Sequence, residues 1–306
     1  MLNLNPIISI YGPTNSGKTS LAIELSEKIP SEIISVDSVQ IYKEANIGSN
    51  KPKQNILNKY PHHLVDFINP KDFYSVGKFK KDAKNLISEI DQKDKHSILT
   101  GGTMMYFYSL FNGLADLPEK NTQIRKKIDE QERRYGLKFL YEQLNESDPQ
   151  SAEKIHENDR QRIKRALEVF MISGKTINQL KNKESENILK KRKSLSFAII
   201  PDDRIHFKES LKSRFEEMIA AGLIDETEML IKKYSKKIPV LQSVGYKQVV
   251  DFIDNKLTKE EMIEKATNAN YQLAKRQITW LNKLKTTEKF FVKQSNMIIK
   301  ILSYLE

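Results

Sequence analysis

"GPTNSGKT", residues 12–19, has the spacing G-x-x-x-x-G-K-[ST], and this stretch decides the fold. The apolar run at 6–11 before it predicts a buried strand, and residues 20–29 after it predict a helix. A glycine-rich turn between a strand and a helix is typical of a phosphate-binding loop (P-loop), whose backbone amides converge on phosphate oxygens. The sequence therefore predicts a bound phosphate group, but it does not say whether ATP or another diphosphate carries it.

Each residue type in the loop suits this chemistry. Gly12 and Gly17 allow backbone angles and close approaches that a side chain would block. Lys18 supplies positive charge, and the hydroxyl of Thr19 can ligate Mg²⁺, the cofactor that we expect. A chance glycine-rich turn is the alternative, and the strand and helix around the loop argue against it. The expected diphosphate-binding residues are Gly12, Pro13, Thr14, Asn15, Ser16, Gly17, Lys18 and Thr19.

Strands and helices alternate through the first part of the chain. Further strands are expected at 32–38, 62–68 and 97–100, with a helical apolar period over 76–90 before the last of them. This βαβ rhythm predicts an α/β fold, a P-loop-type parallel sheet flanked by helices, with ligands at the carboxyl ends of the strands. Asp37 and the segment 101–103 follow strands, as the phosphate loop does. We therefore expect the three motifs at one edge of the sheet.

The middle of the chain has a different character. Residues 116–195 read as charged helices without a strand candidate, and the strand pattern resumes at 195–200. This predicts a catalytic core of 1–115 and 196–306 with a helical insertion domain, 116–195. The insertion has 19 basic and 14 acidic residues, a net charge of +5 out of +11 for the whole chain. Positive charge on both parts is expected if one polyanion binds across them.

Composition excludes several classes of protein. The 306 residues include no cysteine, which excludes disulfides, thiolate catalysis and cysteine-ligated zinc. No apolar run approaches the ~20 residues of a membrane span, and the N-terminus lacks the features of a signal peptide. We therefore expect a cytoplasmic protein without a membrane partner. Its charge suits a polyanion such as nucleic acid.

A small-molecule kinase is the first alternative. P-loop enzymes that hydrolyse ATP usually place an aspartate at the end of a strand to help hold Mg²⁺. The segment 96–103 offers Thr100 and glycines at this place, but no acid. Asp37 is the strand-end acid near the loop, and in a kinase it could orient the acceptor hydroxyl. The loop and the composition leave this alternative open.

Seven stretches extend the pattern along the chain. In order they are 12–43, "IGSNKP" (47–52), "YPHHLVD" (60–66), "LTGGTMMYF" (99–107), "NDRQRIKRALEVFMISGKT" (158–176), "SVGYKQ" (243–248) and "LAKRQITWL" (273–281). Together they resemble the tRNA dimethylallyltransferases, from about residue 7 to 285. The chain departs from that family's usual residues at Ser49 and Asn50, where Thr-Ala is common, and at Asn282, where Arg is common.

The resemblance implies a reaction that the residues can perform. Members of the family transfer a dimethylallyl group from dimethylallyl diphosphate to the exocyclic amine of the adenosine just 3′ of a tRNA anticodon. That amine is a weak nucleophile, because its lone pair is delocalised into the ring, so its alkylation needs a base and a stabilised leaving group. The expected catalytic residues are Asp37 as base, Lys18 beside the departing diphosphate, and Thr103. A helix cap or an outer-sphere Mg²⁺ partner is the alternative for Asp37, and a helix N-cap for Thr103.

The resemblance also implies a tRNA surface, built for the anticodon stem-loop. The expected tRNA-binding residues are Asp37, Ser38, Val39, Gln40, Thr103, Arg125, Gln161, Arg162, Ile163, Lys164, Arg165, Gln242, Ser243, Val244, Gly245, Tyr246, Lys247, Lys275, Arg276, Gln277 and Thr279. A solvated helix face paired with Glu157 and Glu168 is the alternative for 160–165. We expect a monomer. Besides a kinase, the rival functions are a non-catalytic RNA-binding module and an enzyme that prenylates free adenine nucleotides.

Overall fold

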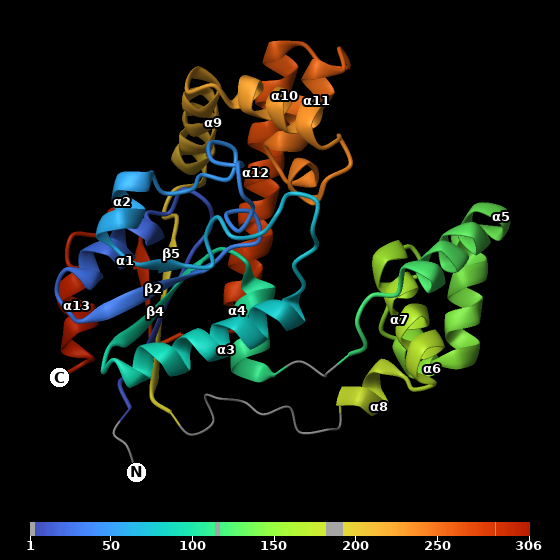
Figure 1. The fold of residues 1–306 in the computed structure, drawn as a ribbon, viewed down its shortest axis with the longest axis horizontal. Helices are drawn as coiled ribbons and strands as arrows, with labels where there is room; N and C mark the ends of the chain where they lie inside the picture. The colour runs from blue at the N-terminus through green and yellow to red at the C-terminus, as the bar shows by residue number, and fades with distance from the viewer. Residues whose placement is uncertain (1–3, 114–116, 182–191, 285) are drawn as a thin grey trace. The chain divides into compact units, whose positions relative to one another are not determined.

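The computed structural model describes residues 4–113, 117–181, 192–284 and 286–306 (Figure 1). The chain divides into two compact units, a larger one of Met1–Ser109 with Ile188–Glu306 and a smaller one of Leu110–Asn187. The insertion expected at 116–195 includes residues 116 and 182–191, which lie outside the described part.

The larger unit is built on a parallel sheet of six strands in the order β3-β2-β4-β1-β5-β6. Its strands are β1 (Ile7–Tyr11), β2 (Ser31–Val36), β3 (His62–His63), β4 (His96–Gly101), β5 (Ser194–Ile200) and β6 (Glu288–Phe291). The predicted α/β fold with a parallel sheet is confirmed. The strand expected at 62–68 shortens to two residues, because the backbone at Leu64 and Asp66 is left-handed. The edge strand β6 was not predicted.

Helices cover both faces of this sheet. Ile8 and Ile10 of β1 pack in one cluster with Leu21 of α1 (Lys18–Ser26) and Ile301 of α13 (Met297–Ser303). Successive side chains of a strand point to opposite faces, so Tyr11 lies on the other face. There its ring meets Phe107 of α4 (Met104–Asn112) edge-on, with centroids 4.6 Å apart.

The helix α3 (Val76–Gln92) lies beside α4 and packs on β2 and β4. Phe79 of α3 stacks on Tyr106 of α4, with centroids 4.2 Å apart and ring planes 13° from parallel. The short helix α2 (Gln54–Lys59) precedes β3. The resulting sandwich of helices and sheet fixes where each strand ends, which is where the expected ligand site lies.

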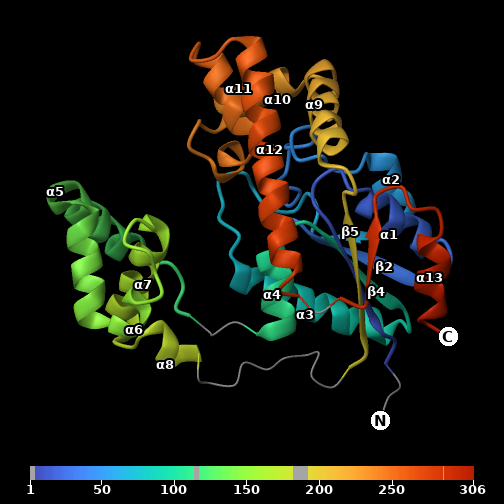
Figure 2. The same ribbon diagram turned by 180° about the vertical axis from the view of Figure 1, so that it is seen from behind.

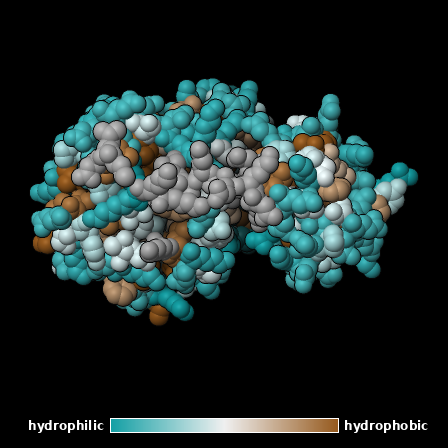
Figure 3. All heavy atoms as spheres, turned by 90° about the horizontal axis from the view of Figure 1, so that it is seen from below, coloured by the Kyte–Doolittle hydropathy of each residue, from teal (hydrophilic) through white to brown (hydrophobic). Residues whose placement is uncertain are grey.

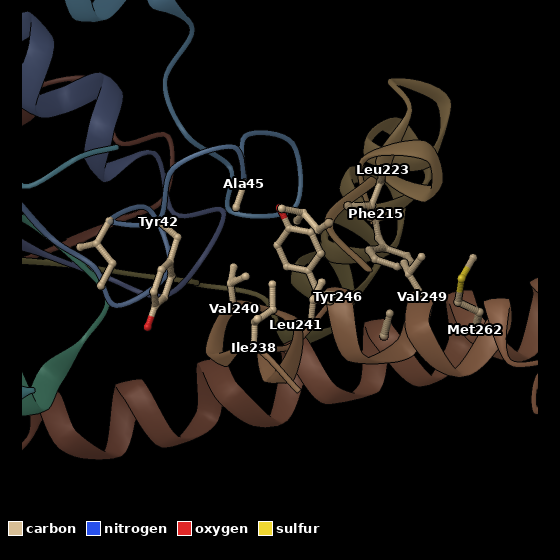
Figure 4. Packing of buried hydrophobic residues seen from close by; sticks show 13 residues of the cluster. Tyr42, Ala45, Phe215, Leu223, Ile238, Val240, Leu241, Tyr246, Val249 and Met262 are labelled. Atoms are coloured by element: carbon tan, nitrogen blue, oxygen red, sulfur yellow. The ribbon is translucent and has the colours of Figure 1, made fainter. Parts of the chain in front are cut away.

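Four further helices gather beyond the end of the sheet where β5 leads into α9 (Figures 1 and 2). They are α9 (Arg204–Ala220), α10 (Leu223–Lys233), α11 (Tyr246–Ile253) and α12 (Lys259–Leu281), with the short 3-10 helix η2 (Pro239–Gln242) before α11. Their core includes Phe215, Leu223, Tyr246 and Met262, and it extends to the loop that follows β2 through Ala45 (Figure 4).

The smaller unit contains four described helices: α5 (Thr122–Ser147), α6 (Pro149–Ala152), α7 (Arg160–Ser173) and α8 (Ile177–Lys181). Gly136 bends α5, since its φ of 86° and ψ of 172° are not helical. Asp159 caps α7 by accepting the backbone N–H of Arg162 at 3.1 Å. Across the described ranges of both units, no helix is long and apolar enough to span a membrane.

Candidate active site

A cavity of about 510 Å³ lies in the larger unit, where the loops that follow β1, β2 and β4 meet. The lining includes Lys18 from the phosphate loop, Asp37 from the end of β2, and Thr103 from the end of β4. The three motifs that the sequence placed at one edge of the sheet therefore come together. The remaining walls come from five places: the 48–50 loop, the start of α4, the segment 242–245, α9 and α12.

The phosphate loop is held in a specific backbone conformation. A Cβ on Gly12 would lie 2.9 Å from the backbone oxygen of Ile199, so only glycine fits there. Gly17, at φ +82°, has a conformation that a side chain would strain. Asn15 is also left-handed (φ 65°), and its Nδ2 donates to the carbonyl and Oγ of Ser210 at 3.2 and 3.1 Å. These bonds attach the loop to α9.

Lys18 of the phosphate loop is half-buried and lines the cavity. Its Nζ donates to the carbonyl of Pro13 at 3.1 Å. Burial lowers the pKa of Lys18, and the nearby charge of Asp37 acts in the opposite direction. A diphosphate bound here would give this ammonium group the counter-charge that it lacks.

The loop also fits a magnesium ion held chiefly by its substrate. Thr14 and Thr19 line the cavity, and Ser16 has a buried Oγ without a hydrogen-bond partner among the described residues. In the described part of the chain no three His, Asp or Glu side chains cluster to form a metal site. Mg²⁺ commonly binds through one or two protein oxygens, several waters and substrate phosphates, so the hydroxyl of Thr19 fits this mode.

Asp37 has one oxygen in use and one free. Its Oδ1 accepts the backbone N–H groups of Val39 at 2.8 Å and Gln40 at 3.2 Å. Its Oδ2 has no hydrogen-bond partner among the described residues, and the side chain lines the cavity. The carboxylate thus caps a turn at 37–40, rather than the helix that one alternative named, and still presents an oxygen that can accept a proton.

Thr103 joins the ends of β2 and β4. Its N–H donates to the carbonyl of Val36 at 3.1 Å. Its hydroxyl accepts from the N–H of Ser38 at 3.1 Å and donates to the Ser38 hydroxyl at 3.3 Å. The side chain therefore holds the turn next to Asp37 in place, and the described hydrogen bonds do not include an N-cap of α4.

The helix α12 and the segment before α11 form another wall. Arg276, an exposed residue of α12, lines the cavity, while Gln277 is buried and donates its Nε2 to the carbonyl of Gly102 at 2.7 Å. Lys275 and Thr279 are exposed on the same helix. The cavity is also lined from the other chain segment by Gln242, Ser243, Val244 and Gly245, and Lys247 just beyond them is exposed.

Tyr246 has a different position from the one expected. Its side chain is fully buried in the core of α9–α12 rather than exposed to a ligand (Figure 4). The resemblance assigned it to tRNA binding, but its placement leaves a structural role: it holds the neighbouring lining segment against the core.

The sequence did not single out the wall formed by α9. Leu211, Phe215 and Met218 recur at helical spacing and line the cavity with apolar surface. Arg214 lies among them, with its guanidinium donating to the side-chain oxygen of Asn50. Apolar residues at this spacing occur in any amphipathic helix. The adjacent Arg214 was therefore the one feature in this helix that could have indicated a cavity wall.

Two of the predicted RNA contacts in the smaller unit are bound to a buried acid. Arg125 Nε lies 2.7 Å from Glu168 Oε1, and Arg165 Nη1 lies 2.7 Å from Glu168 Oε2. Burial raises the pKa of Glu168, but the hydrogen bonds from Arg125, Arg165 and the backbone of Asn121 outweigh it and bring the pKa to about 2. The first role of Arg125 and Arg165 is therefore to neutralise the charge of the buried Glu168 carboxylate.

Of the other α7 residues predicted to bind tRNA, some have structural partners and some are exposed. Ile163 is buried in the core of the smaller unit, so its placement does not support a side-chain contact with RNA. Lys164 is held between Asp129 at 2.6 Å and Glu132 at 2.5 Å. Gln161 and Arg162 are exposed. Figure 3 shows that the visible face of the smaller unit is mainly hydrophilic.

The sequence is similar to proteins of known activity along most of its length. A family model described as IPP transferase matches residues 40–284. A tRNA dimethylallyltransferase of Neisseria meningitidis is 41% identical over 278 residues, 90% of this chain and 88% of the relative. One of Francisella tularensis is 43% identical over 277 residues, 90% of each chain.

The fold is similar to solved structures with the same kind of description. A full-length tRNA isopentenylpyrophosphate transferase of Bacillus halodurans matches with a TM-score of 0.71 and 28% identity, over 98% of this chain and 95% of that one. A eukaryotic dimethylallyltransferase acting on tRNA matches with a TM-score of 0.82 and 27% identity, over 98% of this chain and 77% of that one.

Proposed function

Because this chain belongs to the IPP transferase family of tRNA dimethylallyltransferases, we propose that it transfers a dimethylallyl group from dimethylallyl diphosphate to tRNA. The acceptor is the exocyclic amine of the adenosine 3′ of the anticodon. The new bond joins the amine nitrogen to the first carbon of the dimethylallyl group. The bond between that carbon and the diphosphate oxygen breaks, and diphosphate leaves.

Asp37 takes the proton that the amine loses. Its Oδ2 is free among the described residues, and its Oδ1 is fixed by two backbone N–H groups, so the carboxylate has a defined orientation at the cavity. Thr103 acts beside it by holding the turn through Ser38. A positioned base is expected to contribute a factor of ~10²–10⁴ to the rate.

The phosphate loop binds the diphosphate of the donor. Lys18, the loop amides and the guanidinium of Arg214 supply positive charge around the leaving group. Mg²⁺, held by Thr19 and the substrate, would neutralise further charge on the departing diphosphate. Met218 of α9, half-buried beside Leu211 and Phe215 in the cavity lining, offers an apolar surface for the hydrocarbon.

The anticodon stem-loop is bound by exposed polar and basic residues of both units. Arg162 and Gln161 in the smaller unit, and Lys275, Arg276 and Lys247 in the larger one, are the exposed members of the expected set. The target nucleotide must leave its stack to reach the cavity, which costs a few kcal/mol. Contacts with the phosphate backbone offset this cost. We keep a cytoplasmic monomer as the expected form.

The observation that supports prenyl transfer over phosphoryl transfer is the composition of the cavity. It combines a phosphate loop, a strand-end carboxylate and an apolar wall, whereas β4 ends in Thr100 and glycines instead of an acid. A direct test is to incubate the protein with tRNA, Mg²⁺ and either labelled dimethylallyl diphosphate or labelled ATP. Label is expected to enter tRNA from the first donor alone. Transfer of phosphate from ATP to tRNA or to any of a panel of metabolites would revive the kinase alternative.

A further inference from the structure

A buried carboxylate outside the cavity joins two of its walls. Glu226, in the first turn of α10, is 9% exposed and does not line the cavity. Its Oε2 accepts the N–H groups of Asn46 at 2.8 Å and Ile47 at 2.9 Å. Its Oε1 accepts the N–H of Gly48 at 3.0 Å and the hydroxyl of Tyr246 at 2.5 Å.

These four donors match the acceptor capacity of one carboxylate. An ionised carboxyl group offers about four lone-pair sites and no donor. A neutral amide in its place would direct an NH₂ group at N–H or O–H donors, so glutamine keeps the shape but cannot make the same bonds. The position at the N-terminus of α10 also favours a negative charge. The site is therefore built for glutamate.

Both segments that Glu226 holds continue into the cavity lining. Gly48, whose N–H is bound, lines the cavity together with Ser49 and Asn50 after it, and the lining segment 242–245 ends next to Tyr246. The ring of Tyr246 also lies against the backbone of Gly48, because a Cβ there would be 2.3 Å from Tyr246 Cζ. Figure 4 shows the Tyr246 hydroxyl pointing toward the loop that contains Ala45.

A chain of hydrogen bonds leads from this anchor to Asp37. The carbonyl of Asn50, two residues after Gly48, accepts the Nε2 of Gln40 at 3.0 Å. The side-chain oxygen of Gln40 accepts from Ser35 Oγ at 3.1 Å, and its backbone N–H donates to Asp37 Oδ1 at 3.2 Å. The 46–50 loop thus supports the turn that orients Asp37.

We propose that Glu226 is a positioning residue for the transfer reaction: by fixing the 46–50 loop against Tyr246, it sets the orientation of Asp37. This inference rests on the proposed function, in which Asp37 is the base. It assigns Glu226 no contact with either substrate. Its effect on the rate is exerted through Gln40 and Asp37.

The test compares Glu226→Gln with Glu228→Gln, an exposed glutamate of the same helix, in single-turnover transfer with saturating donor and tRNA. A misplacement of reacting groups by about 1 Å can cost ~10²-fold. We expect Glu226→Gln to slow the transfer step by about ten- to a hundredfold. Glu228→Gln should match the unmodified protein. Equal rates for the two variants would overturn the proposal, whereas absence of transfer in the unmodified protein would refute the proposed function instead.

A double-mutant cycle separates positioning of Asp37 from general damage to the fold. Residues that act through one another give non-additive effects. In an Asp37→Asn background, Glu226→Gln should therefore change the residual rate by less than about twofold. If Glu226→Gln does not fold, Gly48→Ala takes its place in the cycle. This substitution pushes the loop away from Tyr246 without changing any charge. A full additional loss in the Asp37→Asn background, with either variant, would contradict the assignment.

Discussion

Lys18 and Asp37 line the same cavity and interact electrostatically, although one lies in the phosphate loop after β1 and the other at the end of β2, which β4 separates from β1 in the sheet. One is a half-buried cation whose pKa is lowered by burial, and the other is a carboxylate with one oxygen that accepts no hydrogen bond from the described residues. A reaction that releases diphosphate beside Lys18 and a proton beside Asp37 uses both side chains. This pairing leads to the first two predictions.

Asp37→Asn should lower the single-turnover rate by ~10²–10⁴-fold, because the amide cannot accept the proton. The asparagine oxygen can still accept the N–H groups of Val39 and Gln40, so the turn is expected to persist. The measurement is transfer under saturating substrates, with tRNA affinity as the control. A near-normal rate would exclude Asp37 as the base.

Lys18→Ala should weaken binding of dimethylallyl diphosphate, and Lys18→Arg should retain most of it. Burial lowers the pKa of Lys18 from its ordinary value of 10.5. The charged form binds the donor, so affinity is present below this lowered pKa and is lost as pH rises through it. Calorimetric titrations from neutral to alkaline pH should show this loss for the unmodified protein. The arginine variant should show a flat profile, since arginine keeps its proton; the same slope in both would contradict the role of Lys18.

Glu168→Gln should destabilise the smaller unit by about 1–3 kcal/mol at pH 7, because it removes the charge and replaces one of the two oxygens that accept from Arg125, Arg165 and the N–H of Asn121 with an NH₂ donor. The pKa of Glu168 is lowered to about 2, so its contribution is fully present above the ordinary value of 4.5 and is lost as pH falls toward 2. Hydrogen exchange in α5 and α7 measures this. The difference between variant and unmodified protein should shrink with acid, and the exposed Glu146→Gln should show none. A difference that persists unchanged at pH 2 would be inconsistent with a linked ionisation.

Arg162→Ala and Arg276→Ala should weaken tRNA binding and reduce its salt dependence. Each lost phosphate contact lowers the slope of log affinity against log salt by about 0.7–0.9. Both side chains are exposed, whereas Lys164 is held by two acids, so Lys164→Ala should have a smaller effect. The exposed Lys289 of edge strand β6 provides a control substitution. Unchanged slopes for Arg162→Ala and Arg276→Ala would place the tRNA elsewhere.

The main features of the core follow from short-range sequence patterns. The phosphate loop, β1, β2, β4 and β5 each have a local signal: a glycine motif or an apolar run that ends in a polar residue. The edge strand β6 lacks one, because "EKFF" is only four residues long and its two charged residues are followed by two aromatic ones, so that polar and apolar residues do not alternate. The resemblance indicated which stretches approach the cavity. It did not distinguish the residues that line the cavity from the buried residues that hold them in place.

Most of the supporting residues that the sequence analysis did not identify are buried charged side chains. Glu226 lies between Leu223 and Leu230 on the buried side of α10, and Glu168 lies among the buried residues of α7. A charge on an apolar helix face is a signal that sequence could have offered. Its partners were not predictable, because Tyr246 and the 46–48 loop are distant in sequence and meet Glu226 only through the tertiary fold.

The most direct test of the proposed reaction is to locate the new bond. An anticodon stem-loop with adenosine at the 3′-adjacent position is compared with one that has inosine there, which carries an oxygen in place of the amine. Each is incubated with the protein, Mg²⁺ and dimethylallyl diphosphate, digested to nucleosides and analysed by mass spectrometry. We predict a dimethylallyl group on the amine nitrogen of that one adenosine, and no product from the inosine loop. Equal labelling of both loops, or labelling of other nucleotides in the adenosine loop, would contradict the assignment of acceptor and base.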